Sequence, residues 1–278
     1  MKLESSEFDW VIEAGRTERH YWMDLWRYRE LFYFLAWRDI LVRYKQTVIG
    51  IAWALIRPVL AMLVLTVVFG KLARLPSGDF PYPILVFCGL LPWQFFSSSL
   101  SESSNSLIAN SNLISKVYFP RLVVPASAVI TSLVDFLIAS GFLAMLMMWY
   151  RFVPDWRTVT LPLFITITFV AAIGPGMWLA ALNVKYRDFR YVVPFLVQFG
   201  LYFSPVGFSS SVVPDSWRLI YYLNPMAGVI DGFRWAILGP PAAIFLPGFC
   251  ISMVMIILLA VTGVWYFRST ERAFADVI

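Results

Sequence analysis

The sequence has few of the side chains on which catalytic and metal sites are usually built. One histidine and two cysteines occur among its 278 residues. The single histidine, His20, excludes metal sites made of several imidazoles, and Cys88 and Cys250 lie in apolar segments that do not suit a disulfide framework. The phosphate-binding pattern G-x-x-x-x-G-K-[ST] is absent, because the one Gly-Lys pair, at 70–71, is followed by leucine. An ATP site of this type is therefore excluded.

Charged residues are also scarce. They make up 14% of the chain and hydrophobic residues make up 60%, whereas soluble domains carry about 25% charged residues. A helix crosses the bilayer core, about 30 Å thick, with roughly 20 apolar residues. We therefore expect an all-α polytopic membrane protein with six transmembrane helices, at 48–70, 80–100, 122–150, 158–184, 191–213 and 248–267.

The region from 191 to 267 is too long for two spans and too broken for three. Between its two spans lie the apolar stretches 219–230 and 235–244, which are too short to cross and are interrupted by prolines. We expect an outer re-entrant helical hairpin at about 214–245. Broken backbone at membrane depth must be satisfied by protein or a water-filled cavity, so the hairpin indicates a transport pathway. Within it, the spacing of Asp231 and Arg234 predicts a local ion pair.

Lysine and arginine are distributed unevenly between the predicted loops. With a cytoplasmic amino terminus, fifteen of the 22 basic residues lie on cytoplasmic segments and six on the outer side. Residues 1–47 contain no long apolar run, so we expect no cleavable signal peptide. The expected organisation is a cytoplasmic segment at 1–47, a six-span domain at 48–267 and a cytoplasmic tail at 268–278. The net charge of +5 follows from this loop bias and predicts no nucleic-acid partner.

Two charged residues, Arg57 and Asp135, lie within the predicted spans. A charge at the bilayer centre costs about 2.5 to 3.5 kcal/mol, so such residues usually face the bundle interior or water. Arg57 either snorkels toward the cytoplasm or lines an aqueous path, whereas we expect Asp135 to be a hydrogen-bonded structural residue. No nucleophile with a nearby partner is evident, which disfavours an enzyme.

The cytoplasmic stretch 101–121 overlaps seven serines at 97–106 and includes Pro120. We expect a polar loop with a short helix, because Pro120 and Pro125 favour a stop and restart of helix. A tight basic turn at 183–190 joins the fourth and fifth spans.

These motifs, in their order and spacing, resemble the membrane subunits of ATP-binding-cassette exporters that move polysaccharides, the O-antigen, capsule and teichoic-acid permeases. The resemblance covers 29–268. The residues that carry it are Arg38, Asp39, Arg43, Tyr44 and Lys45, then Gly50, Trp53, Arg57 and Pro58, Leu113, Ile114, Lys116, Phe119, Pro120 and Arg121, Arg187 and Asp188, and finally 203–206, 223–225 and Arg234.

The resemblance implies a homodimer in the bacterial inner membrane, with both termini cytoplasmic and a lipid-linked polysaccharide as substrate. Two copies of a separate nucleotide-binding subunit would hold ATP and Mg²⁺, and this chain would hold no cofactor. It also implies an interface helix before the first span. The loops that would couple to the ATPase contain Asn112, Lys116, Lys185, Arg187 and Asp188. A drug or lipid exporter of the same superfamily is the alternative.

A conduit for a sugar chain is expected at the two-fold interface, because a packed bundle of six helices leaves little free volume. The resemblance assigns the first and fifth spans to that interface. The candidate path residues are Trp53 and Arg57 on the first span and, recurring on one face of the fifth, Tyr191, Phe195, Phe199 and Tyr202. Their ring faces attract the C–H faces of sugars, although lipid contact or packing is the alternative role of any single ring.

Two further hypotheses concern the ends of this path. Arg43, Lys45 and Arg57 would receive the pyrophosphate of the lipid-linked glycan at the cytoplasmic entrance. At the outer end, Trp217, Tyr221 and Tyr222 of the hairpin would close the conduit at rest.

Overall fold

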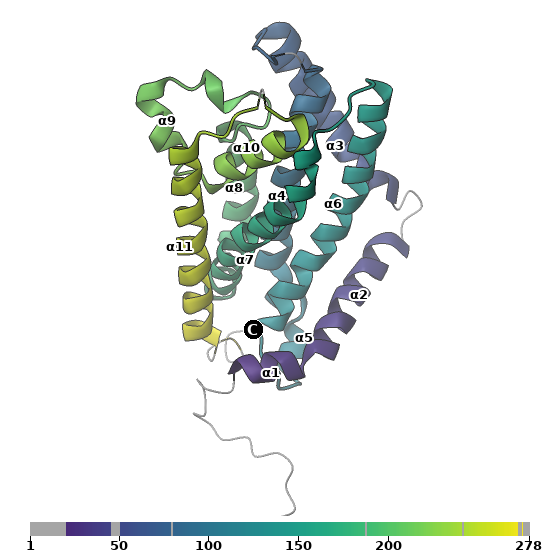
Figure 1. The fold of residues 1–278 in the computed structure, drawn as a ribbon. Helices are drawn as coiled ribbons and strands as arrows, with labels where there is room; N and C mark the ends of the chain where they lie inside the picture. The colour runs from purple at the N-terminus through teal and green to yellow at the C-terminus, as the bar shows by residue number, and fades with distance from the viewer. Residues whose placement is uncertain are drawn as a thin grey trace, which may run out of the picture.

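The computed structural model describes residues 21–45, 51–78, 80–186, 188–240, 242–271 and 274, in which all regular elements are helices (Figure 1). The predicted all-α class is confirmed. Within these described residues, five helical segments are long and apolar enough to cross a membrane. They are α3 (Ile51–Leu65) continued by the π-helix η1 (Thr66–Leu72), α4 (Tyr82–Ala109), α6 (Val123–Trp149), the short η2 (Trp156–Thr160) continued by α7 (Leu161–Lys185), and α11 (Leu246–Thr270).

Some predictions fall outside the described residues. These concern residues 1–20 and 46–50 of the chain, Arg187 in the basic turn, and most of the tail at 268–278.

The fifth predicted span is shorter than expected. The sequence predicts a helix over 191–213, but α8 (Phe189–Phe203) ends at Phe203. Its 15 residues make a helix of about 22 Å, which is less than the bilayer core of about 30 Å. The helix ends there because Ser204 precedes Pro205, and a residue before proline avoids the helical conformation. The short η3 (Ser210–Val212) and α9 (Asp215–Tyr221) follow.

The second span is longer than predicted, because α4 continues through the serine-rich stretch to Ala109. The serine hydroxyls there bond to backbone carbonyls of the same helix, as in Ser104 to Ser101 at 2.8 Å and Ser106 to Ser103 at 2.7 Å. The expectation of a polar loop from 101 onward was therefore wrong for the first nine residues. The predicted short helix is present as α5 (Ser111–Ile114).

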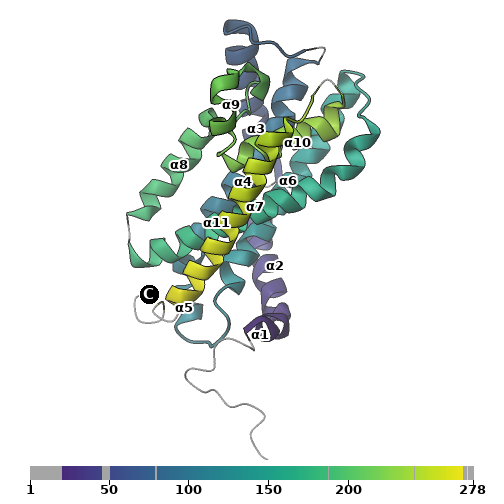
Figure 2. The same cartoon turned by 60° about the vertical axis from the view of Figure 1, so that its left-hand side comes forward.

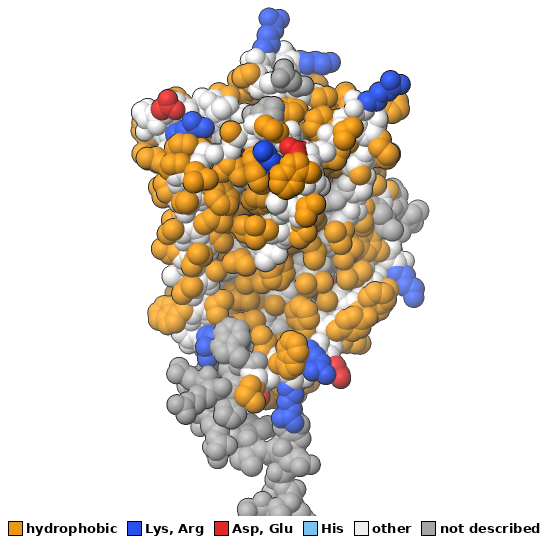
Figure 3. All heavy atoms as spheres, in the orientation of Figure 1, with side chains coloured by type: hydrophobic (Ala, Val, Ile, Leu, Met, Phe, Trp, Pro, Cys, Tyr) orange, Lys and Arg blue, Asp and Glu red, His pale blue; other side chains and the backbone are white. Residues whose placement is uncertain are grey.

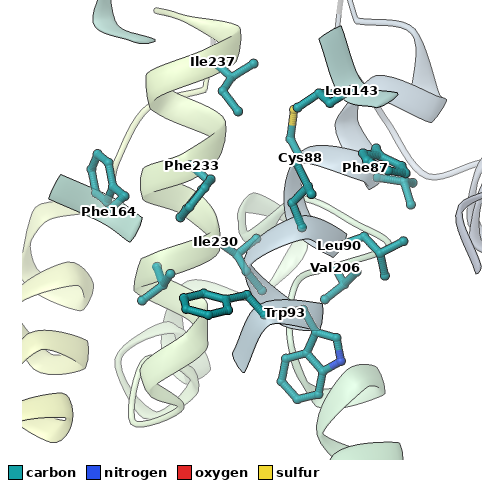
Figure 4. Close-up of a cluster of buried hydrophobic side chains, with 14 of the residues drawn as sticks. Phe87, Cys88, Leu90, Trp93, Leu143, Phe164, Val206, Ile230, Phe233 and Ile237 are labelled. Carbon is teal, nitrogen blue, oxygen red and sulfur yellow. The ribbon is translucent and has the colours of Figure 1, made fainter. Parts of the chain in front are cut away.

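The helix α10 (Pro225–Leu238) is buried inside one end of the bundle. Its amino terminus is set by Asn224, whose side chain accepts a hydrogen bond from the Met226 amide at 3.0 Å, and by Pro225 at the first helical position. Ile230, Phe233 and Ile237 of α10 lie in one buried hydrophobic cluster with Phe87, Cys88 and Leu90 of α4 (Figure 4). This helix therefore belongs to the main hydrophobic core, although it is too short to span a bilayer.

Two short elements lie at the opposite end of the molecule from α9 and α10 (Figure 1). These are α1 (Tyr21–Arg27) and α5, and the oblique helix α2 (Arg29–Lys45) runs from them along α6. Leu35 and Ala36 of α2 are buried, while Tyr33, Phe34 and Trp37 are exposed. Figure 3 shows Lys and Arg gathered mostly at the two ends of the visible face, with hydrophobic side chains over the middle. This distribution matches a multi-pass membrane protein.

The spans differ greatly in how much of their surface the chain itself covers. Within the most apolar 18-residue stretch of each span, the buried share is 83% for α4, 17% for the first span and 22% for α11. Figure 2 shows α8 standing apart at the edge of the bundle. The first span, α8 and α11 therefore offer surface to lipid or to another chain.

Helices α7 and α11 approach most closely where glycines face each other. A Cβ atom added to Gly174 would lie 2.5 Å from Cα of Ala260, and one added to Gly263 would overlap the backbone of Gly174. Because the obstacles are backbone atoms, a rotamer change cannot relieve the overlap. Such small-residue contacts are typical of tightly packed membrane helices.

Replacing Gly174 with alanine is expected to destabilise the fold by about 1 to 3 kcal/mol, the usual cost of overpacking. The measurement is the thermal unfolding midpoint of the purified protein in detergent. Gly141→Ala is the matched control, since nothing lies within 4 Å of a Cβ atom at that position on α6. An equal midpoint for Gly174→Ala and Gly141→Ala would contradict the importance of this crossing.

Candidate functional site

A cavity of about 510 Å³ lies between α2, α3, α4 and α6. Sites for small ligands usually measure about 300 to 1,000 Å³. Its lining combines charged, amide, hydroxyl and aromatic side chains, among them Arg43 and Tyr44 of α2, Trp53 and Arg57 of α3, Gln94 and Glu102 of α4, and Ser132 and Asp135 of α6. Three residues predicted for the entrance or the path thus come together here, whereas Lys45 is exposed and does not line the cavity.

Arg43 is held between two carboxylates. Its Nη2 atom lies 3.1 Å from Oδ2 of Asp135 and 3.3 Å from Oε1 of Glu102. The Tyr44 hydroxyl donates a hydrogen bond to Oδ1 of Asp135. Burial raises the pKa of Tyr44, and this hydrogen bond to a carboxylate raises it further, so the phenol keeps its proton. Asp135 is hydrogen-bonded, as the sequence predicts, and the network ties α2 to α4 and α6.

Arg57 and Trp53 are both exposed and lie one helical turn apart on α3, so they share one side of the cavity. No described residue forms a hydrogen bond or ion pair with Arg57. Of the two roles that the sequence leaves open for Arg57, this arrangement favours lining an aqueous space over snorkelling along lipid.

The two charged residues of α10 do not form the predicted ion pair with each other. Asp231 accepts a hydrogen bond from the Tyr222 hydroxyl. The Arg234 guanidinium donates instead to three backbone carbonyls, those of Phe208 at 2.7 Å, Val206 at 2.9 Å and Leu85 at 3.3 Å. Arg234 is only 3% exposed, so it connects the loop after α8 to α10 and α4 inside the protein.

The three residues predicted to form a gate do not share one surface. Trp217 is exposed, while Tyr222 is fully buried and packs its ring against Phe245 at a centroid distance of 5.7 Å. The Tyr221 hydroxyl is buried without a described hydrogen-bond partner. Tyr222 therefore supports the fold of α9 and α10 from within.

The four aromatic residues predicted on the fifth span all lie on the exposed side of α8. Tyr191, Phe195, Phe199 and Tyr202 are each at least 46% exposed. The rings of Phe195 and Phe199 lie 4.2 Å apart between centroids. The helix thus presents a continuous aromatic stripe outside the subunit, as the periodicity predicts.

The residues predicted to contact an ATPase are exposed where they are described. Asn112 lies in the short helix α5 and Lys116 follows its end, while Lys185 and Asp188 lie at the turn between α7 and α8. Arg187 lies outside the described residues. The segment that contains α5 is held from both sides: Arg38 donates to Oδ1 of Asn110 at 2.8 Å, and the Arg121 amide donates to Oε1 of Glu271 at 2.7 Å. A force applied at α5 can therefore reach α2 and the end of α11.

Three polar residues of the cavity, Gln94, Glu102 and Ser132, are not among the functional residues that the sequence singles out. Glu102 was assigned to a loop, although the helical spacing of the serines around it could have indicated that α4 continues. Ser132 carries no motif at all, yet its hydroxyl is buried at the cavity without a described partner.

Comparison with known proteins gives a consistent result. The family model described as ABC-2 type transporter matches residues 30–238. The chain is 31% identical over 213 residues to the O-antigen export system permease protein RfbA of Myxococcus xanthus, covering 76% of this chain and 81% of that protein. It is 27% identical over 242 residues to the RfbA protein of Klebsiella pneumoniae, covering 87% and 92%. Identity to the polysialic acid transport protein KpsM of Escherichia coli is 23% over 204 residues, covering 72% and 78%.

Proposed function

Because this chain belongs to the ABC-2 type transporter family, we propose that it is the permease subunit of an ATP-driven exporter of lipid-linked polysaccharide. It moves the glycan from the cytoplasmic to the outer side of the inner membrane. The observation that carries this proposal is the similarity, over most of the chain, to proteins named for O-antigen export and polysialic acid transport.

The energy source is a second protein. The sequence lacks the phosphate-binding loop of an ATPase, so two nucleotide-binding subunits supply ATP and Mg²⁺ chemistry. They dock on the exposed residues Asn112, Lys116, Lys185 and Asp188, with Arg187 in the same turn. The hydrogen bonds from Arg38 to Asn110 and from Arg121 to Glu271 support this assignment, because they link α5 to the rest of the membrane domain.

Two copies of the chain enclose the conduit. The exposed first span and the aromatic stripe of α8 support this arrangement, since both present surface that the subunit does not cover itself. Sugars slide along the rings of Tyr191, Phe195, Phe199 and Tyr202, which offer attraction without tight hydrogen bonds. Trp53 and Arg57 lie on the first span of the same conduit wall.

The chain crosses the membrane six times, with both termini in the cytoplasm. The fifth crossing is α8 with the chain after it, α11 is the sixth, and α9 with α10 forms the re-entrant hairpin on the outer side. The bias of fifteen basic residues against six supports this orientation, and the exposed aromatics of α2 support its role as the interface helix. Trp217 is the exposed candidate for an outer gate, with Tyr221 beside it and Tyr222 anchoring both.

At the cytoplasmic entrance, Lys45 and Arg57 meet the pyrophosphate of the carrier, since both are exposed and neither has a described ionic partner. The sequence hypothesis gives Arg43 the same pyrophosphate-binding role. Its guanidinium is instead shared between Glu102 and Asp135. It serves the entrance by holding α2 against α4 and α6.

Depletion of this chain in its native cell tests the function. The expected outcome is loss of a surface polysaccharide together with accumulation of its lipid-linked form inside the cell. Re-expression should restore the surface glycan. Normal surface glycan with an altered lipid or drug distribution would refute polysaccharide export and favour the lipid or drug exporter of the same family.

A further inference from the structure

The cavity between α2, α3, α4 and α6 contains a balanced set of charges. Arg43 and Arg57 contribute two positive charges, and Glu102 and Asp135 contribute two negative charges. Arg43 already forms ion pairs with Asp135 at 3.1 Å and with Glu102 at 3.3 Å. A pyrophosphate inside the cavity would face both carboxylates, which repel it. The interior therefore suits a neutral ligand.

The same cavity is rich in groups that bond to hydroxyls. Carboxylate oxygens accept hydrogen bonds, while Gln94 can both donate and accept. The Ser132 hydroxyl is fully buried at the cavity and has no described partner. A buried hydroxyl without a partner is costly, and a ligand with hydroxyl groups would satisfy it.

Trp53 adds an aromatic surface to this polar set. Its side chain lines the cavity and is 48% exposed, so little protein covers the indole ring. Indole faces carry negative potential and attract the weakly positive C–H faces of sugar rings. A flat ring beside carboxylate, amide and hydroxyl groups is a combination suited to a pyranose.

We propose that this cavity binds a neutral sugar unit of the lipid-linked glycan, with Trp53 stacking on the ring and Glu102, Gln94 and Ser132 bonding to its hydroxyls. The proposal rests on the proposed function and refines it. The bound unit is the sugar next to the pyrophosphate, because Arg57 lies one turn from Trp53 and reaches the charged group at the opening. Each subunit thereby recognises the carrier-linked end of the chain before the glycan enters the conduit.

Binding is measured on the complex of permease and ATPase in lipid nanodiscs, by saturation-transfer NMR with methyl glycosides of neutral hexoses as probes. Parental protein should transfer saturation to at least one glycoside. Trp53→Ala should weaken binding about fivefold to tenfold, the size of one aromatic stacking contact, and Trp53→Tyr should retain it. Glu102→Gln, a second variant at a half-exposed side chain, should also weaken binding.

Trp149→Ala is the matched control, since Trp149 is exposed at the end of α6 and does not line the cavity. It should bind the glycosides as the parent does. The proposal would be overturned if the parental protein transferred saturation to none of the glycosides. It would also be overturned if Trp53→Ala and Trp149→Ala bound the glycosides equally well. Inorganic pyrophosphate that displaces the glycosides from the parental protein would also overturn it.

Export in cells separates this proposal from the function on which it rests. If surface polysaccharide stays normal after this chain is depleted, the proposed export function is refuted. If depletion abolishes the polysaccharide but Trp53→Ala exports at the parental level and binds glycosides normally, the function stands and the sugar site is refuted. The expected pattern is reduced export for Trp53→Ala and recovery with Trp53→Tyr.

Discussion

An Arg234→Met variant should yield almost no folded protein. Arg234 is 3% exposed and donates hydrogen bonds to the carbonyls of Leu85, Val206 and Phe208. Methionine fills a similar volume but donates nothing, so these carbonyls would lose a shared partner inside the protein. Breaking a buried charged contact of this kind costs about 3 to 5 kcal/mol, a large fraction of the stability of most domains. The measurement is the yield of monodisperse protein in detergent, followed by its thermal unfolding midpoint.

Two further variants sharpen the test. Arg234→Lys keeps the charge but lacks the planar fork that reaches several carbonyls together, so it should fall between the parent and Arg234→Met. Arg190→Met replaces an exposed arginine on α8 and should keep the parental midpoint. If Arg234→Met were purified with the stability of Arg190→Met, the loop after α8 would not depend on this residue.

Removing the aromatic stripe of α8 should abolish export without unfolding the subunit. The changes are Tyr191→Ala, Phe195→Ala, Phe199→Ala and Tyr202→Ala together. All four rings are exposed, so their loss leaves no cavity in the core. We expect surface polysaccharide at about a tenth of the parental amount or less, which corresponds to a barrier raised by about 1.4 kcal/mol or more. Immunoblotting of surface glycan, normalised to the amount of permease in the membrane, measures it.

The control for the stripe is a second exposed apolar surface. Val254, Ile257 and Val261 of α11 are each at least 60% exposed. Replacing these three with alanine should leave export unchanged if α11 faces lipid. Equal export from the α8 and α11 variants would show that the rings of α8 contact lipid, which is the alternative role that their periodicity allows.

The sequence predicts the long spans well because hydrophobicity and length are local properties. The two ends of α6, at Val123 and Trp149, lie within one residue of the predicted 122–150. The errors arise where local chemistry competes with the apolar pattern. Apolar residues continue past Phe203, but the Ser204–Pro205 pair ends α8. Serines suggest a loop at 101–109, but their hydroxyls bond within the helix.

The buried contacts could not be derived from residue spacing. Asp231 and Arg234 have the spacing of an ion pair, yet Arg234 bonds to carbonyls of α4 and of the loop after α8, whose positions depend on the tertiary fold. The cavity could be predicted in part. Trp53 and Arg57 could be singled out from the sequence, while the role of Glu102 depends on α4 extending to meet Arg43 of α2.

Reconstitution of the purified permease with its ATPase in proteoliposomes tests polysaccharide export most directly. Radiolabelled lipid-linked glycan is incorporated on the ATPase side, and its exposure to a glycosidase on the opposite side is followed over time. ATP should make the glycan accessible, and a catalytically inactive ATPase should not. Accessibility that is the same with and without ATP hydrolysis would contradict the assignment of this chain as an export permease.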